Sequence, residues 1–303
     1  MTNIPFFLSA DNNYAPFVAT AMASVLDNTT SFIEFYVLDG GLSKENKAKI
    51  TSLKNNFSHF SVEFLKIDFD KYFKDFNETE RITKSMYSRF LIPHQKPEIK
   101  KALYSDVDVI CMGDIREMFD ESLDGYALGA VHETYAEGKN NTQKKARTNI
   151  SDEHKYFSSG NLLIDCEKWR EGNIFEELIK INKAYSQNLL EPDMDILNKY
   201  FDNNYKILPS KYCWINQNYE YFGKPTEPIV IRHFNGPVKP WQISPDVSEN
   251  PKLSFTLDKN KFWHYAQITP FYNMLIQQTK YKTNLDLQKF LVLKFMEKRF
   301  DGT

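Results

Sequence analysis

Two aspartates separated by one residue, Asp106 and Asp108, are the clearest candidates for chemistry in this 303-residue chain. In extended backbone, residues i and i+2 point to the same face, so the two carboxylates would lie roughly 6.6 Å apart along the chain. Hard oxygen ligands of this kind suit Mg²⁺ or Mn²⁺, which usually keep coordination positions for water or a substrate phosphate. Because Asp-X-Asp also occurs by chance, the pair predicts a cation site only with support from other residues.

A second group of candidates lies much later in the chain. His233 follows an apolar segment, residues 229–232, and precedes a Gly-Pro turn. A lone histidine is more often structural, but a neutral imidazole here would complete a site of two carboxylates and one imidazole. Gly236 lets the backbone approach a ligand closely, and Lys239 supplies a point charge suited to phosphate. The spacing of His233, Gly236 and Lys239 therefore predicts a diphosphate clasp that faces the cation.

The first half of the chain predicts the elements that position the acidic pair. Strands and helices alternate in it, with strands at residues 4–9, 32–38 and 62–67 and helices at 16–26 and 43–54. This order predicts parallel pairing with right-handed crossovers, hence a doubly wound half-domain. A further strand at residues 101–104 would release Asp106 and Asp108 at the carboxyl edge of the sheet, where open α/β sheets bind ligands. The first turn lacks G-x-G-x-x-G, so it is not a dinucleotide fingerprint.

The remaining chain predicts a mixture of elements and one loop. We expect strands at residues 126–131, 157–165 and 229–232, and helices at 84–91, 167–184 and from 192 onward. Residues 136–149 are polar and basic and indicate a mobile loop or lid. From residue 271 onward, basic residues outnumber acidic ones on a helix with an apolar face. Such a segment either lies on an anionic membrane surface or packs on the main domain with its lysines in solvent.

Composition limits the class of protein. The chain is 42% hydrophobic and 26% charged, as in a soluble globular protein, and its net charge of -2 argues against bulk attraction to nucleic acid. Three cysteines without a C-x-x-C motif give neither a zinc site nor a disulfide framework, which favours a reducing compartment. The first ten residues lack the basic region of a signal peptide, and no apolar run is long enough to span a bilayer. We therefore expect a cytoplasmic protein.

Taken in order, five motifs resemble those of glycosyltransferase family 8, the retaining nucleotide-sugar transferases. The resemblance runs over about residues 4–241 and is carried by residues 10–14 (ADNNY), 106–108 (DVD), 157–165 (FSSGNLLID), 193–198 (DMDILN) and 233–241 (HFNGPVKPW). It implies an α/β fold of the A type, a single Rossmann-like mixed-sheet nucleotide-binding domain, with a UDP-sugar donor and Mn²⁺ or Mg²⁺. We expect this catalytic domain over residues 1–250 and a helical, basic and apolar extension over residues 251–303.

The resemblance also implies roles for single residues. Around the nucleotide and its diphosphate it places Ser9, Ala10, Asp11, Asn13, Tyr14, Val107, Gly236 and Lys239. As metal ligands it gives Asp106, Asp108 and His233. Near the donor sugar it places Arg89, Glu133, Asp193, Met194 and Asp195. For Arg89 and Asp195, the alternative is a buried ion pair that only shapes the pocket.

Two positions depart from the family pattern. Many members have Asn where this chain has Ser158, so an amide contact to the sugar would be shortened or lost. Many also have Gln where this chain has Met194, and a thioether is no carboxamide. Both changes put the choice of donor and the rate in question.

The implied activity is transfer of a hexose, galactose or glucose, from a UDP-sugar to a hydroxyl of a glycan or lipopolysaccharide acceptor. In a retaining double displacement a carboxylate would attack the anomeric carbon, and Asp193 is the only near candidate. The resemblance instead favours a front-face exchange in which the leaving phosphate takes the acceptor's proton. Two rivals stay open: a nucleotide-sugar-binding protein without catalysis, and a phosphohydrolase of the haloacid dehalogenase type with a D-x-D motif.

Overall fold

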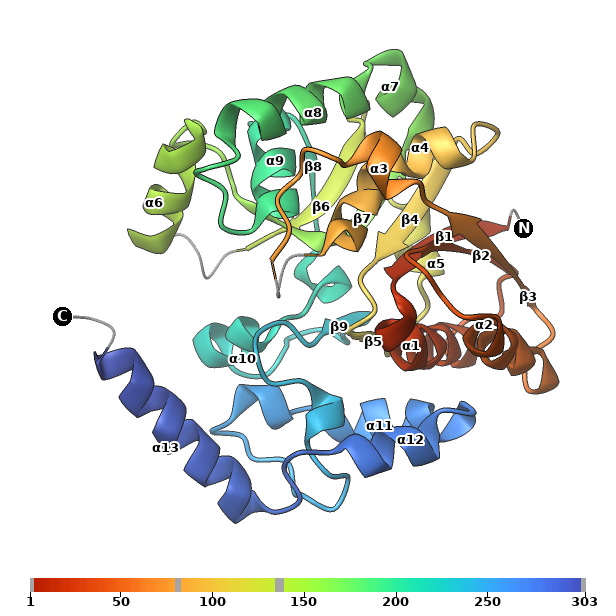
Figure 1. The fold of residues 1–303 in the computed structure, drawn as a ribbon, viewed down its shortest axis with the longest axis vertical. Coiled ribbons are helices and arrows are strands. Elements are labelled where there is room, and N and C mark those ends of the chain that lie inside the picture. The colour runs from red at the N-terminus through yellow and green to blue at the C-terminus, as the bar shows by residue number, and fades with distance from the viewer. Residues whose placement is uncertain (1–2, 80–82, 134–138, 301–303) are drawn as a thin grey trace.

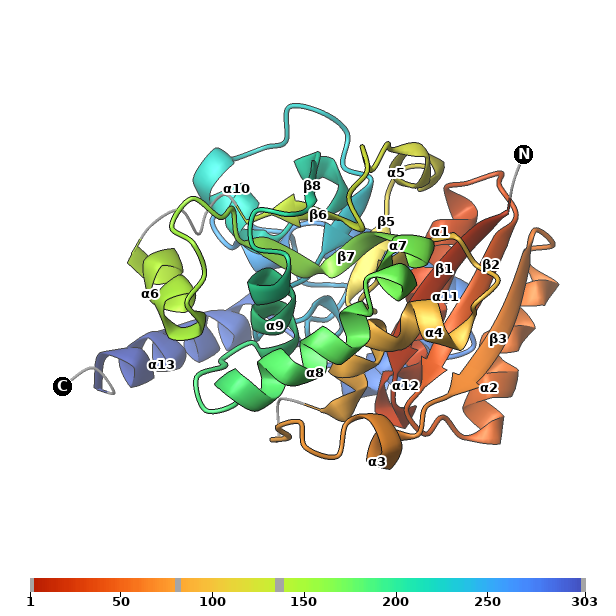
Figure 2. The ribbon, with the colours of Figure 1, turned by 90° about the horizontal axis from the view of Figure 1, so that it is seen from above.

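The computed structural model describes residues 3–79, 83–133 and 139–300, without the side chains of residues 139–141 and 295–300. Seven strands form a central sheet in the order β3-β2-β1-β4-β7-β6-β8, and helices cover both of its faces (Figure 1, Figure 2). Its strands are β1 Ile4–Ala10, β2 Ile33–Asp39, β3 Phe60–Lys66, β4 Lys101–Ser105, β6 Leu128–His132, β7 Phe157–Asp165 and β8 Lys206–Leu208. A separate two-stranded sheet pairs β5 Val109–Cys111 with β9 Ile231–His233.

The longer helices are distributed along the whole chain. They are α1 Ala15–Asp27, α2 Lys44–Thr51, α6 Lys139–Thr148, α7 Cys166–Glu171, α8 Ile174–Tyr185, α9 Pro192–Tyr200, α10 Asn216–Phe222, α11 Lys259–Ile268, α12 Tyr272–Gln278 and α13 Asn284–Phe300. Shorter α-helical turns are α3 Phe69–Tyr72, α4 Ile92–Gln95 and α5 Arg116–Asp120. Short 3₁₀ segments include η1 Asn12–Tyr14, η2 Ser52–Asn55 and η3 Lys84–Leu91.

The predicted doubly wound first half is confirmed. Strand β1 pairs in parallel with β2 and β4, and β2 pairs in parallel with β3. Alternate residues of β1 face opposite sides, so Phe6 and Leu8 join a core with α1 while Phe7 joins a second core with α7 and α8. Burial on both faces explains why the strand reads as a continuous apolar run.

The second half makes the sheet mixed. Strand β7 lies between β4 and β6 and is antiparallel to both. Ser105, the last residue of β4, is opposite Asn161 of β7. The next residue, Asp106, still donates its backbone N–H to the Gly160 carbonyl over 2.8 Å. The acidic pair therefore begins where β4 ends, and the centre of β7 lies beside it.

The strand predicted at residues 229–232 is not part of the main sheet. It forms as β9, pairs antiparallel with β5, and places His233 opposite Val109. The N–H of Phe234 donates to the Asp108 carbonyl over 2.8 Å. This small sheet is what brings His233 to the acidic pair.

Two predictions for the middle of the chain are wrong. The polar segment 136–149, expected as a mobile loop or lid, is not a loop in its described part, where it contains helix α6; residues 136–138 lie outside the described residues. The single helix expected over residues 167–184 is two helices, α7 and α8, because Asn173 between them has a left-handed backbone (φ 47°). Asn tolerates that conformation, which no α-helix can include.

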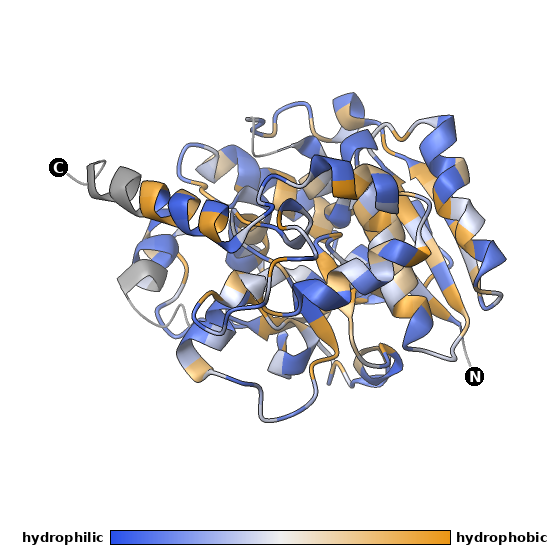
Figure 3. Cartoon of the chain, turned by 90° about the horizontal axis from the view of Figure 1, so that it is seen from below, coloured by the Kyte–Doolittle hydropathy of each residue, from blue (hydrophilic) through white to orange (hydrophobic). Residues whose placement is uncertain are grey.

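The C-terminal helices differ in how they contact the rest of the chain. Phe262 and Trp263 of α11 are buried in the same core as α1. Helix α13 extends away from the body (Figure 1), with Leu287 buried but Val292 and Leu293 exposed. Figure 3 shows apolar and polar residues mixed along this helix. Across the described ranges, every helix is too short or too polar to cross a bilayer.

Candidate active site

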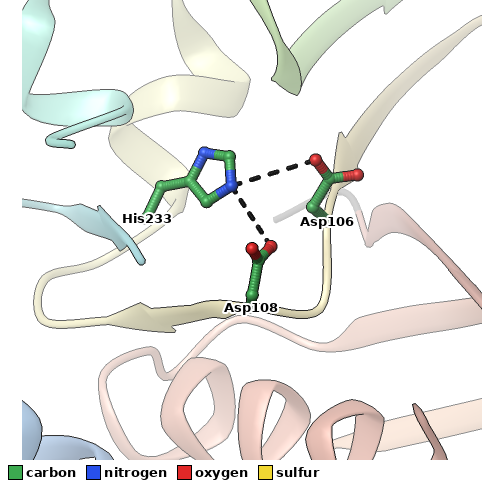
Figure 4. A group of neighbouring side chains, drawn as sticks. All are labelled: Asp106, Asp108 and His233. Atoms are coloured by element: carbon green, nitrogen blue, oxygen red, sulfur yellow. Dashed lines mark ion pairs between the residues drawn. The ribbon is translucent and has the colours of Figure 1, made fainter. Parts of the chain in front are cut away.

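Asp106, Asp108 and His233 converge as predicted (Figure 4). Asp106 follows β4, Asp108 precedes β5, and His233 ends β9. The His233 Nε2 atom lies 3.1 Å from Asp108 Oδ1 and 3.9 Å from Asp106 Oδ2. One ligand atom from each side chain lies within 4.8 Å of the other two. Two carboxylates and one imidazole at this separation are a donor set that suits a small divalent cation.

The outer oxygen of each carboxylate is held by the protein. Asp106 Oδ1 accepts from Arg89 Nη2 (2.8 Å) and from the Tyr104 hydroxyl (2.7 Å). Asp108 Oδ2 accepts from Lys239 Nζ over 2.6 Å. These contacts orient both side chains so that the other oxygen of each faces His233. Ligands fixed in this way need little reorganisation to bind a cation.

Burial and charge together set the protonation of the pair. Burial raises the pKa of Asp108, but the cations Lys239 and His233 outweigh it and the net pKa is lowered. Burial likewise lowers the pKa of His233, and the Asp108 carboxylate overcomes this and raises the pKa to about 10. A divalent cation binds neutral imidazole, so its binding would release this proton.

Gly160, in the centre of β7, leaves space for the side chains of His233 and Asp106. A Cβ at this position would lie 2.4 Å from His233 Cε1, 2.8 Å from Nδ1 and 3.0 Å from Asp106 Oδ2. A glycine inside a strand often marks such a close approach. The absent side chain and the convergent oxygens show that these residues fit a hard divalent cation, Mn²⁺ or Mg²⁺.

Arg89 links the acidic pair to Asp193. Its buried guanidinium bonds Asp106 through Nη2, while Nη1 donates to the Ser159 carbonyl (2.6 Å) and lies 3.2 Å from Asp193 Oδ2. Ser159 Oγ also donates to Asp193 Oδ2 over 2.8 Å. Burial lowers the pKa of Arg89, but Asp106 and Asp193 outweigh it and raise that pKa. Burial raises the pKa of Asp193 despite the opposing effect of Arg89.

Asp195 has a different environment from Asp193. Its Oδ1 accepts from the Tyr156 hydroxyl, and its Oδ2 accepts from the backbone N–H groups of Leu190 (2.8 Å) and Glu191 (3.0 Å). A buried ion pair between Arg89 and Asp195, the alternative given above, is therefore wrong. Arg89 pairs with Asp193 instead. Asp195 fixes the turn that enters α9.

Met194 and Glu133 line the same region from two elements. Met194 is buried in a small apolar cluster with Ile150 and Tyr156. Glu133 follows β6, is buried, and donates its backbone N–H to the Tyr156 carbonyl over 2.9 Å. Tyr156 is thus the common neighbour of both.

Asn198 joins α9 to β7. Its Oδ1 accepts from His154 Nε2 and from the Phe157 N–H, each over 2.8 Å. Its Nδ2 donates to the carbonyls of Phe157 and Met194, each over 2.9 Å. Every hydrogen-bonding position of this fully buried amide is used within the protein, which fixes α9 and its acidic residues against the sheet.

Replacing Asn198 with alanine is expected to lower the free energy of unfolding by about 3 kcal/mol, because several buried partners lose their hydrogen bonds at once. The urea midpoint should fall with little change in slope. Asn188→Ala, which removes an exposed amide bonded to the Arg147 carbonyl, should shift stability by under about 0.5 kcal/mol. Equal midpoints for the two variants would contradict this role for Asn198.

The residues expected around the base begin at the end of β1. Asp11 Oδ1 accepts from the backbone N–H groups of Asn13 (2.8 Å) and Tyr14 (3.3 Å), so this carboxylate caps a 3₁₀ turn. Asn13 is exposed, and Tyr14 is 43% exposed with its ring edge against Phe17. Burial first, and then the carboxylate of Asp108, raise the pKa of Tyr14.

Other residues predicted to bind the nucleotide are buried or form hydrogen bonds within the protein. Ser9 Oγ donates to the Ser85 carbonyl over 2.8 Å and lies 2.7 Å from Ser88 Oγ. Ala10 and Val107 are buried, and the Ala10 carbonyl accepts from the Gly40 N–H over 2.9 Å.

The turn after β9 carries the predicted clasp. Gly236 has a φ of 90°, which favours glycine. Lys239 Nζ donates to Asp108 Oδ2 and to the Phe234 carbonyl (2.8 Å), and the side chain is 22% exposed. The ammonium group thus lies beside the acidic pair, and its role toward a diphosphate stays a prediction.

Several neighbours of the site were missed by sequence reasoning. Tyr104 and Ser159 hold the carboxylates of Asp106 and Asp193, and Cys213 contacts His233. Tyr104 shares a face with Asp106 by the i, i+2 rule, which would have identified it. Nothing in the spacing of Cys213 points to His233.

Comparison with known proteins agrees with this architecture. Residues 5–244 match the profile of Glycosyl transferase family 8. General stress protein A of Bacillus subtilis (strain 168) is 30% identical over 281 residues, which cover 86% of this chain and 92% of that protein. The lipopolysaccharide 1,3-galactosyltransferase of Salmonella typhimurium is 27% identical over 243 residues, covering 76% and 71%.

A solved structure shares the fold. The galactosyltransferase LgtC, in complex with donor and acceptor sugar analogs, superposes with a TM-score of 0.77 at 23% identity and covers 88% of this chain and 96% of its own. The predicted A-type α/β fold is thereby confirmed. With a profile match over residues 5–244, the chain belongs to glycosyl transferase family 8 and is a glycosyltransferase.

Proposed function

We propose that this enzyme transfers a hexose, galactose or glucose, from a UDP-sugar to a hydroxyl of a glycan or lipopolysaccharide acceptor, with retention of configuration and with Mn²⁺ or Mg²⁺ bound. The convergence of Asp106, Asp108 and His233, with Lys239 beside them, is the observation that carries the proposal. The Salmonella relative is a lipopolysaccharide galactosyltransferase and LgtC is a galactosyltransferase, which supports a galactosyl donor and a lipopolysaccharide acceptor.

The proposed roles follow from the contacts. Asp106, Asp108 and His233 would hold the cation, which when bound supplies positive charge to the departing diphosphate. Lys239 adds a second positive charge next to it, and Gly236 allows the backbone to approach the phosphates. Tyr14 would stack on the uracil while Asp11 and Asn13 contact the base and ribose. Arg89 keeps Asp106 and Asp193 in place on either side of the guanidinium.

The environment of Asp193 favours a front-face exchange over a covalent intermediate. Its Oδ2 accepts from Ser159 Oγ over 2.8 Å and lies 3.2 Å from Arg89 Nη1. A carboxylate tied in this way is a weak nucleophile. In the front-face route the leaving phosphate oxygen takes the acceptor's proton, so the protein needs no base of its own.

Asp193→Asn is therefore expected to lower turnover only modestly, by about tenfold, because the amide keeps the hydrogen bond to Ser159 but leaves Arg89 with one carboxylate partner. The control is Asp202→Asn, in which the carboxylate bonds Ser151 away from the acidic pair. Intact-mass spectrometry after incubation with a fluorinated UDP-sugar should detect no glycosylated wild-type enzyme. A sugar trapped on Asp193 would refute the front-face route.

One series of measurements tests the activity as a whole. Calorimetric titration with UDP in the presence of Mn²⁺, followed by assay of donor hydrolysis, should show binding and slow turnover. Binding without turnover toward any UDP-sugar would favour a non-catalytic nucleotide-sugar-binding protein, for which the apolar surroundings of Met194 are a reason. Phosphatase activity without nucleotide binding would favour the phosphohydrolase. Protection of the fold against heating by individual UDP-sugars would identify the donor.

The location of the enzyme is part of the same proposal. We propose that it acts in the cytoplasm and associates peripherally with the membrane through α13. Leu285, Val292 and Leu293 of this helix are exposed, and Lys289 lies among them in the sequence. Co-sedimentation with anionic vesicles should decrease when α13 is removed, and equal sedimentation would exclude this attachment.

A further inference from the structure

The imidazole of His233 is enclosed on the side away from the carboxylates. A Cβ at Gly160 would lie 2.4 Å from Cε1 and 2.8 Å from Nδ1 of the ring and 3.0 Å from Asp106 Oδ2, so this glycine borders both the ring and that carboxylate. The Cys213 Sγ atom lies 3.6 Å from Nδ1, within hydrogen-bond distance for sulfur. Both Cys213 and His233 are buried, so water does not replace this contact at Nδ1. The thiol is therefore the partner of the ring nitrogen that faces away from the cation site.

A second contact determines which way the proton points. The Cys213 thiol donates to Ser158 Oγ over 3.7 Å, and the same oxygen accepts from the Gly160 N–H over 3.3 Å. Because the S–H hydrogen is used in this bond, the sulfur is left to accept from Nδ1–H of His233. Once a cation has displaced the proton on Nε2, a neutral imidazole that keeps its proton on Nδ1 presents the lone pair of Nε2 to the cation beside Asp106 and Asp108.

The backbone around Cys213 is fixed to the strand that carries His233. The carbonyl of Trp214 accepts from the His233 N–H over 3.0 Å, and the Trp214 N–H donates to the Ile231 carbonyl over 2.9 Å. The fully buried Arg232 also donates from Nη1 to the Trp214 carbonyl over 3.0 Å. Cys213 therefore cannot move independently of the histidine it contacts.

We propose that Cys213 is a positioning residue of the cation site, which holds His233 with its proton on Nδ1 and Nε2 free to bind the metal. Ser158, the residue that replaces the usual asparagine, is the acceptor that orients the thiol. The inference rests on the proposed cation-dependent function. Partners of this kind behind a metal-binding histidine typically change metal affinity ten- to a hundredfold, and a thiol is a weak acceptor, so we expect about tenfold.

Two matched pairs of variants test the hydrogen bond separately from packing. Cys213→Ser and Cys213→Ala differ by one hydroxyl, and Cys213→Thr and Cys213→Val repeat the comparison with a fuller side chain. The affinity for Mn²⁺ is measured with saturating UDP from the electron paramagnetic resonance signal of free Mn²⁺. Cys213→Ala and Cys213→Val should bind Mn²⁺ about tenfold more weakly than wild type, while the hydroxyl variants retain most of the affinity.

Cys166→Val controls for the loss of a buried thiol. This buried cysteine is the first residue of α7 and its sulfur is 4.0 Å from the Ile164 carbonyl, so its replacement should leave Mn²⁺ affinity unchanged. Equal Mn²⁺ affinity in wild type and in a folded Cys213→Ala or Cys213→Val variant would overturn the proposal. So would equal losses in the hydroxyl and apolar variants. Failure of the wild-type enzyme itself to bind Mn²⁺ with UDP would instead reject the proposed function on which the inference rests.

Discussion

Replacing Asp108 with asparagine is expected to reduce turnover about a thousandfold, equivalent to about 4 kcal/mol of transition-state stabilisation. The amide keeps the shape of the side chain but removes its charge. The oxygen that faces His233 becomes a weaker cation ligand, and Lys239 loses the carboxylate 2.6 Å from its ammonium group. Initial rates of sugar transfer across a range of Mn²⁺ concentrations measure the effect, and a chelator added to the wild type should reproduce it.

The control for this variant is the same substitution on the surface. Asp120 lies at the end of α5 with a 62% exposed side chain and pairs with Arg116 at 3.5 Å. Exposed ion pairs contribute little, so Asp120→Asn should change turnover by less than about twofold. Turnover of Asp108→Asn within tenfold of wild type at saturating Mn²⁺ would contradict the cation site.

The first half of the fold could be predicted because apolar strands alternate with helices both in its sequence pattern and in its structure. Buried parallel strands read as continuous apolar runs, and helix α2 begins after a capping serine. Ser43 accepts from the Asn46 N–H at the start of α2, the hydrogen bond typical of a serine that precedes a helix. Strand order then follows from right-handed crossovers.

The second half depends on contacts that no local pattern contains. Helix α6 has few apolar residues, and its end is held by distant partners: Ile150, just after it, packs with Tyr156 and Met194, and Lys145 donates to the Asp152 carbonyl. Strand β9 reads like any buried strand, and only its pairing with β5 shows that it lies outside the main sheet. These are cases in which tertiary contacts override local preference.

The candidate site, like the fold, could be predicted only in part from the sequence. Strand geometry predicted that Asp106 and Asp108 lie on one side, but the bend between β4 and β5 that contains them was not predicted. The role of His233 came from its turn and from the family resemblance. The partners of the buried carboxylates could not be predicted from the sequence. Arg89, Asp193 and Asp195 are all buried charges, and which of them pair depends on their positions in three dimensions. Asp195 satisfies backbone N–H groups while Asp193 pairs with Arg89.

Gly160→Ala is the second change expected to have a large effect. A Cβ at residue 160 would lie 2.4 Å from His233 Cε1, well inside van der Waals contact. The strand cannot move away, because β7 is hydrogen-bonded between β4 and β6. The ring of His233 must therefore shift by about 1 Å from the position that faces both carboxylates, and a misplacement of this size costs about a hundredfold in turnover.

The matched control is a glycine on the neighbouring strand. A Cβ at Gly129 of β6 would meet only the side-chain ends of Leu123 and Leu208, at 2.9 and 3.3 Å, which can rotate away. Gly129→Ala should cost some stability and leave Mn²⁺ affinity unchanged, whereas Gly160→Ala should lose Mn²⁺ affinity while its circular dichroism spectrum stays that of the wild type. If Gly160→Ala bound Mn²⁺ as tightly as wild type, His233 would not need this space and its place among the ligands would be in error. Comparing Gly160→Ala with Gly129→Ala therefore tests directly whether β7 leaves the space that the imidazole and the cation need together.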